Sequence, residues 1–72
     1  SDYPRGTTEV FGHLLTTRNV LTNQQLIDEL ELGDKTVSAA RNHLDEEGLI
    51  DFPSGLKKGF RIKPETKRLF RK

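Results

Sequence analysis

The sequence predicts a small α+β domain, mostly helical, in which three helices are followed by a C-terminal β-hairpin. Apolar residues recur at helical spacing in three segments between residues 7 and 47. Two short runs with alternating apolar and polar residues then flank a glycine-containing loop. The 72 residues are enough for a single domain spanning 1–72 with a small core.

The first helix is expected to follow an extended segment at residues 1–6, because Pro4 and Gly6 in this segment both oppose helix formation. It is expected to begin at Thr7 or Thr8, with the hydroxyl as N-cap, and to end around 17–19. Gly12 inside it weakens the helix by about 1 kcal/mol relative to alanine and is a candidate for a close helix contact. Its apolar face comprises Val10, Phe11, Leu14 and Leu15.

The second helix has a specific start signal. Thr22 and Gln25, three residues later, form a capping box pattern. The stretch before it, at residues 20–21, is too short for more than a bridge or a short strand. The helix is expected to end near residues 32–33, with Gly33 as a left-handed C-terminal cap. Its buried stripe comprises Leu26, Ile27 and Leu30.

The third helix, expected over residues 34–47, begins directly after the second. Only Gly33 and Asp34 separate them, and Asp34 can cap the new helix. Gly48 is expected to end it. The inner side comprises Val37, Ala40 and Leu44; the outer side comprises Lys35, Ser38, Ala39 and Asn42; Thr36, His43 and Arg41 lie at the borders.

The two alternating runs, "LIDF" at 49–52 and "FRIK" at 60–63, predict a β-hairpin around the loop "PSGLKKG" at 53–59. Pro53 confines the first strand to an edge or ends it. The last segment, residues 64–72, forms either a short helix that begins with Pro64 or a frayed tail.

Charge is unevenly distributed, although the net charge is only +1. Residues 57–72 contain eight bases and one acid, which makes a local positive patch that attracts polyanions. The alternative is a solubilising tail. There is no cysteine, no apolar run that would span a membrane, and no catalytic, metal or phosphate-loop motif. We therefore expect no enzyme activity, no cofactor, no metal and a cytoplasmic protein.

The order of helix, helix, tight turn, helix and hairpin resembles the winged-helix (winged helix-turn-helix) family over nearly the whole chain. The stretch "TVSAARNHLDEEGLI" is similar to MarR- and GntR-type regulators. The "ARN" triplet at 40–42 is similar to N-terminal domains of phage replisome organisers and DnaD-like proteins. Arg41 departs from the pattern, because many winged helices have leucine there. This arginine is expected to reach either Asp45 or a DNA phosphate.

The resemblance implies binding of double-stranded DNA, with the third helix in the major groove and the basic wing on the backbone or in the minor groove. The basic wing comprises residues 53–63. Small Ser38 and Ala39 would let the helix approach, and Asn42 would suit adenine. The acids at 45–47 would lie where the helix leaves the duplex. The expected DNA-binding residues are Thr22, Asn23, Gln24, Lys35, Thr36, Ser38, Ala39, Arg41, Asn42, Ser54, Lys57, Lys58 and Arg61.

Two functions remain open at this point. The first is DNA binding with some sequence preference, in replication initiation of a phage or plasmid or in transcriptional regulation, near the nucleoid. The second is a winged helix that binds proteins through the acidic surface of the second and third helices. Expected partners are double-stranded DNA and other domains of a longer parent protein. Without a long heptad helix, the isolated domain is expected to be a monomer.

Overall fold

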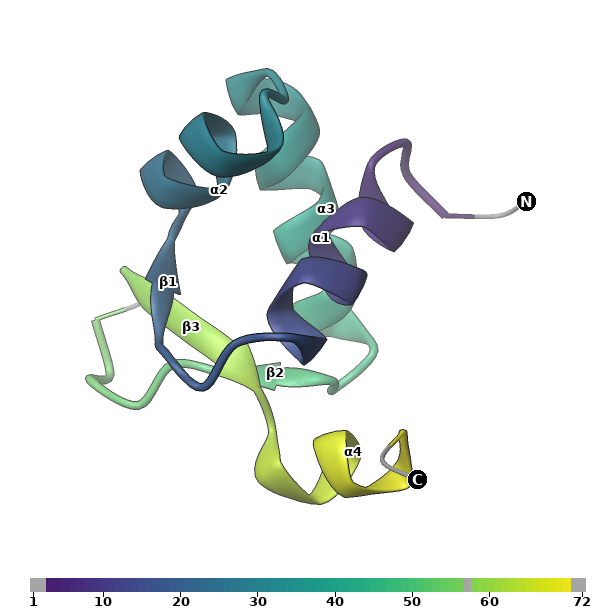
Figure 1. The fold of residues 1–72 in the computed structure, drawn as a ribbon, viewed down its shortest axis with the longest axis vertical. Coiled ribbons are helices and arrows are strands. Elements are labelled where there is room, and N and C mark those ends of the chain that lie inside the picture. The colour runs from purple at the N-terminus through teal and green to yellow at the C-terminus, as the bar shows by residue number, and fades with distance from the viewer. Residues whose placement is uncertain (1–2, 57, 71–72) are drawn as a thin grey trace.

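The computed structural model describes residues 3–56 and 58–70 and confirms a mostly helical α+β domain (Figure 1). Within these residues it has four helices and one antiparallel sheet of three strands. None of the described helices is long and apolar enough to cross a membrane. The elements, in chain order, are α1 (Thr7–Leu15), β1 (Leu21–Thr22), α2 (Asn23–Leu30), α3 (Asp34–Glu46), β2 (Ile50–Asp51), β3 (Gly59–Ile62) and α4 (Pro64–Leu69).

The sheet has the order β1-β3-β2, so the last strand lies in the middle. The expected hairpin is β2 and β3, in which Ile50 faces Ile62 across the ladder. The expected short strand before α2 is β1, which pairs with the other edge of β3 through Leu21 and Phe60. Figure 1 shows α2 leaving the sheet directly from β1, while α1 and α3 cover the sheet from one end.

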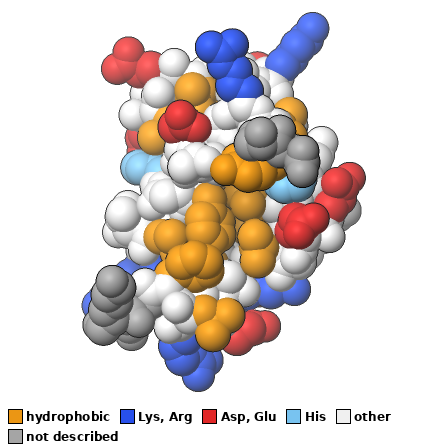
Figure 2. Space-filling model, turned by 90° about the vertical axis from the view of Figure 1, so that its right-hand side faces the viewer, with side chains coloured by type: hydrophobic (Ala, Val, Ile, Leu, Met, Phe, Trp, Pro, Cys, Tyr) orange, Lys and Arg blue, Asp and Glu red, His pale blue; other side chains and the backbone are white. Residues whose placement is uncertain are grey.

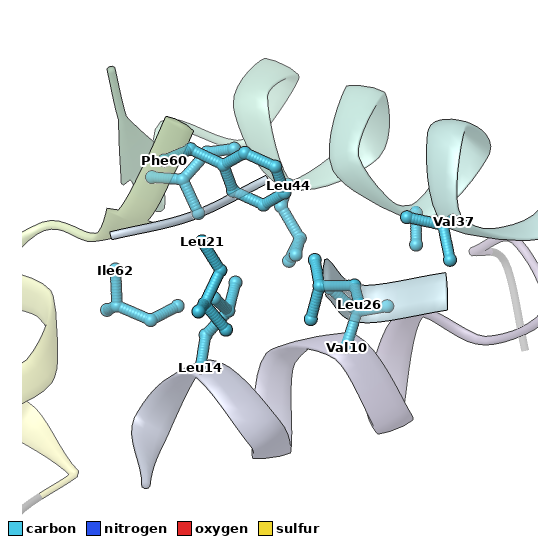
Figure 3. Close-up of a cluster of buried hydrophobic side chains, with 10 residues drawn as sticks. Val10, Leu14, Leu21, Leu26, Val37, Leu44, Phe60 and Ile62 are labelled. Atoms are coloured by element: carbon cyan, nitrogen blue, oxygen red, sulfur yellow. The ribbon is translucent and has the colours of Figure 1, made fainter. Parts of the chain in front are cut away.

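The core lies between the three long helices and the inner face of the sheet. Because the helical stripes and the strand alternation both point inward, most predicted stripe residues are buried (Figure 3). The remaining stripe residues, which are partly buried and pack against the core, are Phe11, Leu15, Ile27 and Leu30. Each fully buried aliphatic or aromatic side chain contributes about 1.5–3 kcal/mol. The buried hydrophobic residues are Val10, Leu14, Leu21, Leu26, Val37, Ala40, Leu44, Ile50, Phe60 and Ile62.

Two helix-end signals are confirmed. At the start of α2, the Thr22 hydroxyl accepts a hydrogen bond from the Gln25 amide at 3.2 Å, and the Gln25 side chain accepts one from the Thr22 amide at 2.9 Å. At the end of α3, Gly48 has φ 73°. The Leu49 amide then donates to the Leu44 carbonyl at 3.0 Å, which ends the helix in a Schellman motif.

The start of α1 differs from the prediction. Gly6, in the left-handed region with φ 86°, is the N-cap, and no threonine side chain caps the helix. Thr7 instead donates through its hydroxyl to the Pro4 carbonyl at 2.7 Å, in a turn that replaces the expected extended segment. The close contact predicted for Gly12 is at Gly6: a Cβ on Gly6 would lie 2.6 Å from the Thr36 methyl group, whereas one on Gly12 would meet nothing within 4 Å. The helix also ends earlier, at Leu15.

The turn between α2 and α3 differs too. The left-handed residue that ends α2 is Glu31, with φ 55°, and not Gly33. Gly33 is the N-cap of α3 with an ordinary φ of −75°, and Asp34 lies inside the first turn without a side-chain cap. A non-glycine left-handed residue costs about 1–2 kcal/mol, so this tight turn is held by the packing of the helices around it. At the C-terminus, the helical alternative is confirmed for Pro64–Leu69.

Candidate nucleic-acid interface

Three segments that are distant in sequence meet at one side of the molecule. The Asn23 amide group at the start of α2 donates to the Ser38 hydroxyl on α3 at 3.3 Å. Thr22 pairs with Gly59, the first residue of β3 after the hairpin loop. The start of α2 therefore connects the first part of α3 to the hairpin. We call this surface the α2–α3–hairpin face and define it by residues 22–24, 35–42, 54–56 and 58–59.

The outer side of α3 on this face is narrow. Lys35, Ala39 and Asn42 are exposed, Ser38 and Thr36 are half-buried, and the inner residues of the same helix belong to the core. Because a small residue occupies the middle of the exposed strip, a partner surface can come close to the helix backbone. Lys35 at the first turn contributes a positive charge, and its exposed side chain can reach an anionic partner.

Asn23 and Ser38 are engaged with each other and are both half-buried. That Asn23 and Ser38 contact DNA stays a prediction, and each of them would bring one existing hydrogen-bond partner to such a contact. The side-chain oxygen Oδ1 of Asn23 is buried and has no hydrogen-bond partner among the described residues. The pair joins α2 to α3 and fixes where the outer side of α3 lies.

The other two predicted residues of α2 also have local partners. Thr22 is used by the capping box, and the Gln24 side chain donates to the Asp28 carboxylate at 3.0 Å. Gln24 is exposed, so this one-turn contact can be exchanged for another acceptor at little cost. Backbone N–H groups at the start of α2 remain a natural place for an anion.

Arg41 does not reach Asp45, the first of its two expected destinations, and the second, a DNA phosphate, stays a prediction. Its guanidinium donates a hydrogen bond to the side-chain amide oxygen Oδ1 of Asn42 at 3.1 Å and forms no hydrogen bond or ion pair with Asp45. A bidentate contact of Asn42 with adenine would use both its side-chain oxygen and its side-chain nitrogen, and the oxygen already accepts one hydrogen bond from Arg41.

The hairpin loop is shaped by a turn and a side-chain bond. The Gly55 amide donates to the Phe52 carbonyl at 2.8 Å, and Gly55 itself has φ 76°. The Ser54 hydroxyl accepts from the Leu56 amide at 3.3 Å, which gives Ser54 a structural role in the loop. Lys58 is exposed beside β3. The predicted contact at Lys57 lies outside the described residues.

Arg61 points away from the core as expected, but it is not a free cation. Its Nε donates to Asp51 at 2.9 Å and a second nitrogen lies 3.4 Å from the other carboxylate oxygen. This hydrogen bond raises the pKa of Arg61 above its ordinary value. The strand register pairs Asp51 with Arg61, a signal that could have been read by aligning "LIDF" against "FRIK".

The basic C-terminal segment is also partly used by the fold. Lys67 on α4 donates to the backbone carbonyl of Thr17, which ties α4 to the link between α1 and β1. His13 on α1 contacts Glu29 on α2 at 2.6 Å. Residues 3–56 and 58–70 contain no group of three His, Cys, Asp or Glu side chains that could hold a metal ion. The freely exposed cations of the α2–α3–hairpin face are thus Lys35 and Lys58.

No family model, no curated protein and no solved structure matches this chain.

Proposed function

We propose that this domain is a winged helix that binds double-stranded DNA, with α3 in the major groove and the hairpin as a wing on the backbone or in the minor groove. The observation that carries the proposal is the junction at α2, where Asn23 bonds to α3 and Thr22 pairs with β3. It places a helix with a narrow outer side next to a hairpin with an exposed lysine.

The shape of α3 supports this proposal. A major groove about 12 Å wide accepts a helix if small side chains cover its outer side. Ala39 is at the centre of that side, with Lys35 toward the helix start and Asn42 one turn further. We assign Asn42 to a base edge and Lys35 to a phosphate, since amides read adenine and lysines neutralise backbone charge.

The charge distribution along α3 gives the helix a direction on DNA. Asp45, Glu46 and Glu47 are all exposed at its C-terminal end and would be repelled by phosphates. The first half carries Lys35, and the hairpin joined to the start of α2 carries the exposed Lys58. The proposed pose therefore inserts the N-terminal half and leaves the acidic end outside the duplex.

A second candidate function is a protein-interaction module, and one observation favours it. The three exposed acids at residues 45–47 have no hydrogen bond or ion pair to another described side chain. A basic segment of another protein, or another domain of a longer parent chain, could bind there. For the DNA-binding candidate, the proposed setting is replication initiation or transcriptional regulation near the nucleoid in the cytoplasm.

The test is a fluorescence anisotropy titration with a random duplex at two salt concentrations. We expect binding that weakens with salt, and we expect Lys35→Ala and Lys58→Ala each to lower the slope of log K against log salt by about 0.9. Arg68→Ala, which removes the same charge from exposed α4, is the matched control and should leave affinity nearly unchanged. Absence of duplex binding at low salt, or equal effects of all three variants, would contradict the proposal.

A further inference from the structure

A second surface of the molecule is apolar and lies away from the α2–α3–hairpin face. A groove of about 250 Å³ runs between α1 and the C-terminal part of α3. Figure 2 shows apolar side chains gathered in a band across this side of the molecule, with acidic side chains at one edge. The residues that line the groove are Tyr3, Thr7, Thr8, Phe11, His43, Leu44, Glu47 and Leu49.

Two large apolar side chains next to the groove are exposed. Leu69 is 82% exposed and Phe70 is 57% exposed. The Phe70 ring packs edge-on against Phe11, with ring centroids 5.2 Å apart. Because Phe11 also lines the groove, the groove and the exposed end of α4 belong to one continuous surface.

The groove has room for such a side chain. A cavity of about 150 Å³ is enough to hold benzene, so the groove accepts a leucine or a phenylalanine. Leu69 is exposed to solvent and does not line the groove of its own molecule. Among the described residues, this surface carries both an unfilled apolar groove and an unpacked apolar side chain, a combination that favours self-association.

The charges next to these features are complementary as well. Arg68 precedes Leu69 in the chain and is exposed, while Glu47 is part of the groove lining. If Leu69 enters the groove of another copy, its neighbour Arg68 comes within reach of that copy's Glu47. The same pair forms a second time under two-fold symmetry.

We propose that this surface binds a second copy of the chain, with Leu69 of each copy in the groove of the other and Arg68 paired with Glu47. This proposal differs from the monomer expected from the absence of a long heptad helix. It does not depend on DNA binding, because the groove lies at the end of α3 that the proposed DNA pose leaves outside the duplex.

The first experiment is sedimentation velocity from micromolar to millimolar protein. The wild type should shift from monomer to dimer, and Leu69→Glu should weaken the association about a hundredfold or more, since each dimer loses two buried leucines. Leu56→Glu is the matched control, because Leu56 is 71% exposed in the hairpin loop and lies outside the groove. It should dimerise like the wild type. Thermal melts should show that both variants remain folded.

The second experiment exchanges the charges. Glu47→Arg and Arg68→Glu should each weaken the dimer about tenfold, and the double variant should recover most of the affinity. A wild type that stays monomeric at millimolar concentration would overturn the proposal. A dimer that persists unchanged in Leu69→Glu, or a double variant weaker than both single variants, would overturn this mode of contact.

Discussion

The two halves of α3 are held very differently. The first half is fixed from two sides, because Gly6 of α1 lies against Thr36 and Asn23 of α2 bonds to Ser38. In the second half, Arg41 bonds to its neighbour Asn42, and the His43 ring lies against Tyr3 with ring centroids 6.0 Å apart. The difference teaches that contacts with other elements fix the first half of α3 in place, while exposed side chains such as Lys35 in the first half and Asn42 in the second stay available to a partner.

The same comparison applies to the apolar side chains of the helix. Val37 and Ala40 are buried in the core, whereas Leu44 is buried yet also forms part of the groove lining. The second half of α3 therefore connects the core to an unfilled apolar surface. The start of α3 is thus fixed by polar contacts, and its C-terminal part borders the apolar groove.

Substitution of Gly6 should have the largest effect on stability, because Gly6 lies against Thr36 in the first half of α3. We expect Gly6→Ala to lower the free energy of unfolding by about 2 kcal/mol, from a left-handed φ of 86° and a Cβ placed 2.6 Å from the Thr36 methyl group. Urea denaturation measures the loss. Gly55→Ala is the control, since its φ of 76° is similar but its Cβ meets nothing within 4 Å. Equal losses in both variants would show that the contact with Thr36 is unimportant.

Asn42 tests the available half. We expect Asn42→Ala to cost about 1–3 kcal/mol of binding free energy on a preferred duplex and much less on random DNA, because amide contacts to base edges carry sequence preference. Titrations of one variant against both duplexes provide the measurement. Equal losses on the two duplexes would reassign Asn42 to a phosphate contact or a structural role.

Gly12 provides a substitution that lies outside α3. It lies inside α1, and a Cβ there would meet nothing within 4 Å. We expect Gly12→Ala to raise the free energy of unfolding by about 1 kcal/mol through the helix propensity of alanine. Affinity for DNA should not change. A lower midpoint in urea would contradict the open space seen around this residue.

Arg41 should show the smallest effect on stability. Its guanidinium contacts only a neutral neighbour, so we expect Arg41→Leu to change the free energy of unfolding by less than about 0.5 kcal/mol or to raise it slightly. DNA affinity should fall if the arginine turns to a phosphate. Thermal melts and a titration on the same protein separate the two effects. A large drop in melting temperature with normal binding would assign Arg41 to the fold.

Local patterns were sufficient to predict most of the fold. The spacing of Val37, Ala40 and Leu44 identified the buried side of α3, and Thr22 with Gln25 identified the start of α2. These signals depend on residues within one or two turns of each other. The position of each helix in the chain and the presence of the hairpin follow from such short-range patterns.

The partners of the polar residues were not predictable in the same way. Asn23 and Ser38 are 15 residues apart, and their bond depends on how α2 packs on α3. The role of Glu31 as the left-handed residue was missed because the glycine two residues later is the stronger local signal. For the candidate site, the sequence did not show which side chains are already engaged within the protein, as Asn23 is with Ser38 and Arg61 is with Asp51.

The sheet has a consequence for the order in which the molecule folds. Residues of the three long helices can meet early, since α2 follows β1 directly and α3 follows α2 after one short turn. The sheet, in contrast, requires segments far apart in the chain to come together. β1 pairs with β3, and Lys67 bonds to Thr17 across 50 residues. Closing so long a loop is entropically costly, so the hairpin should dock last and detach first. Amides of β3 should therefore exchange with solvent in openings that leave α3 intact.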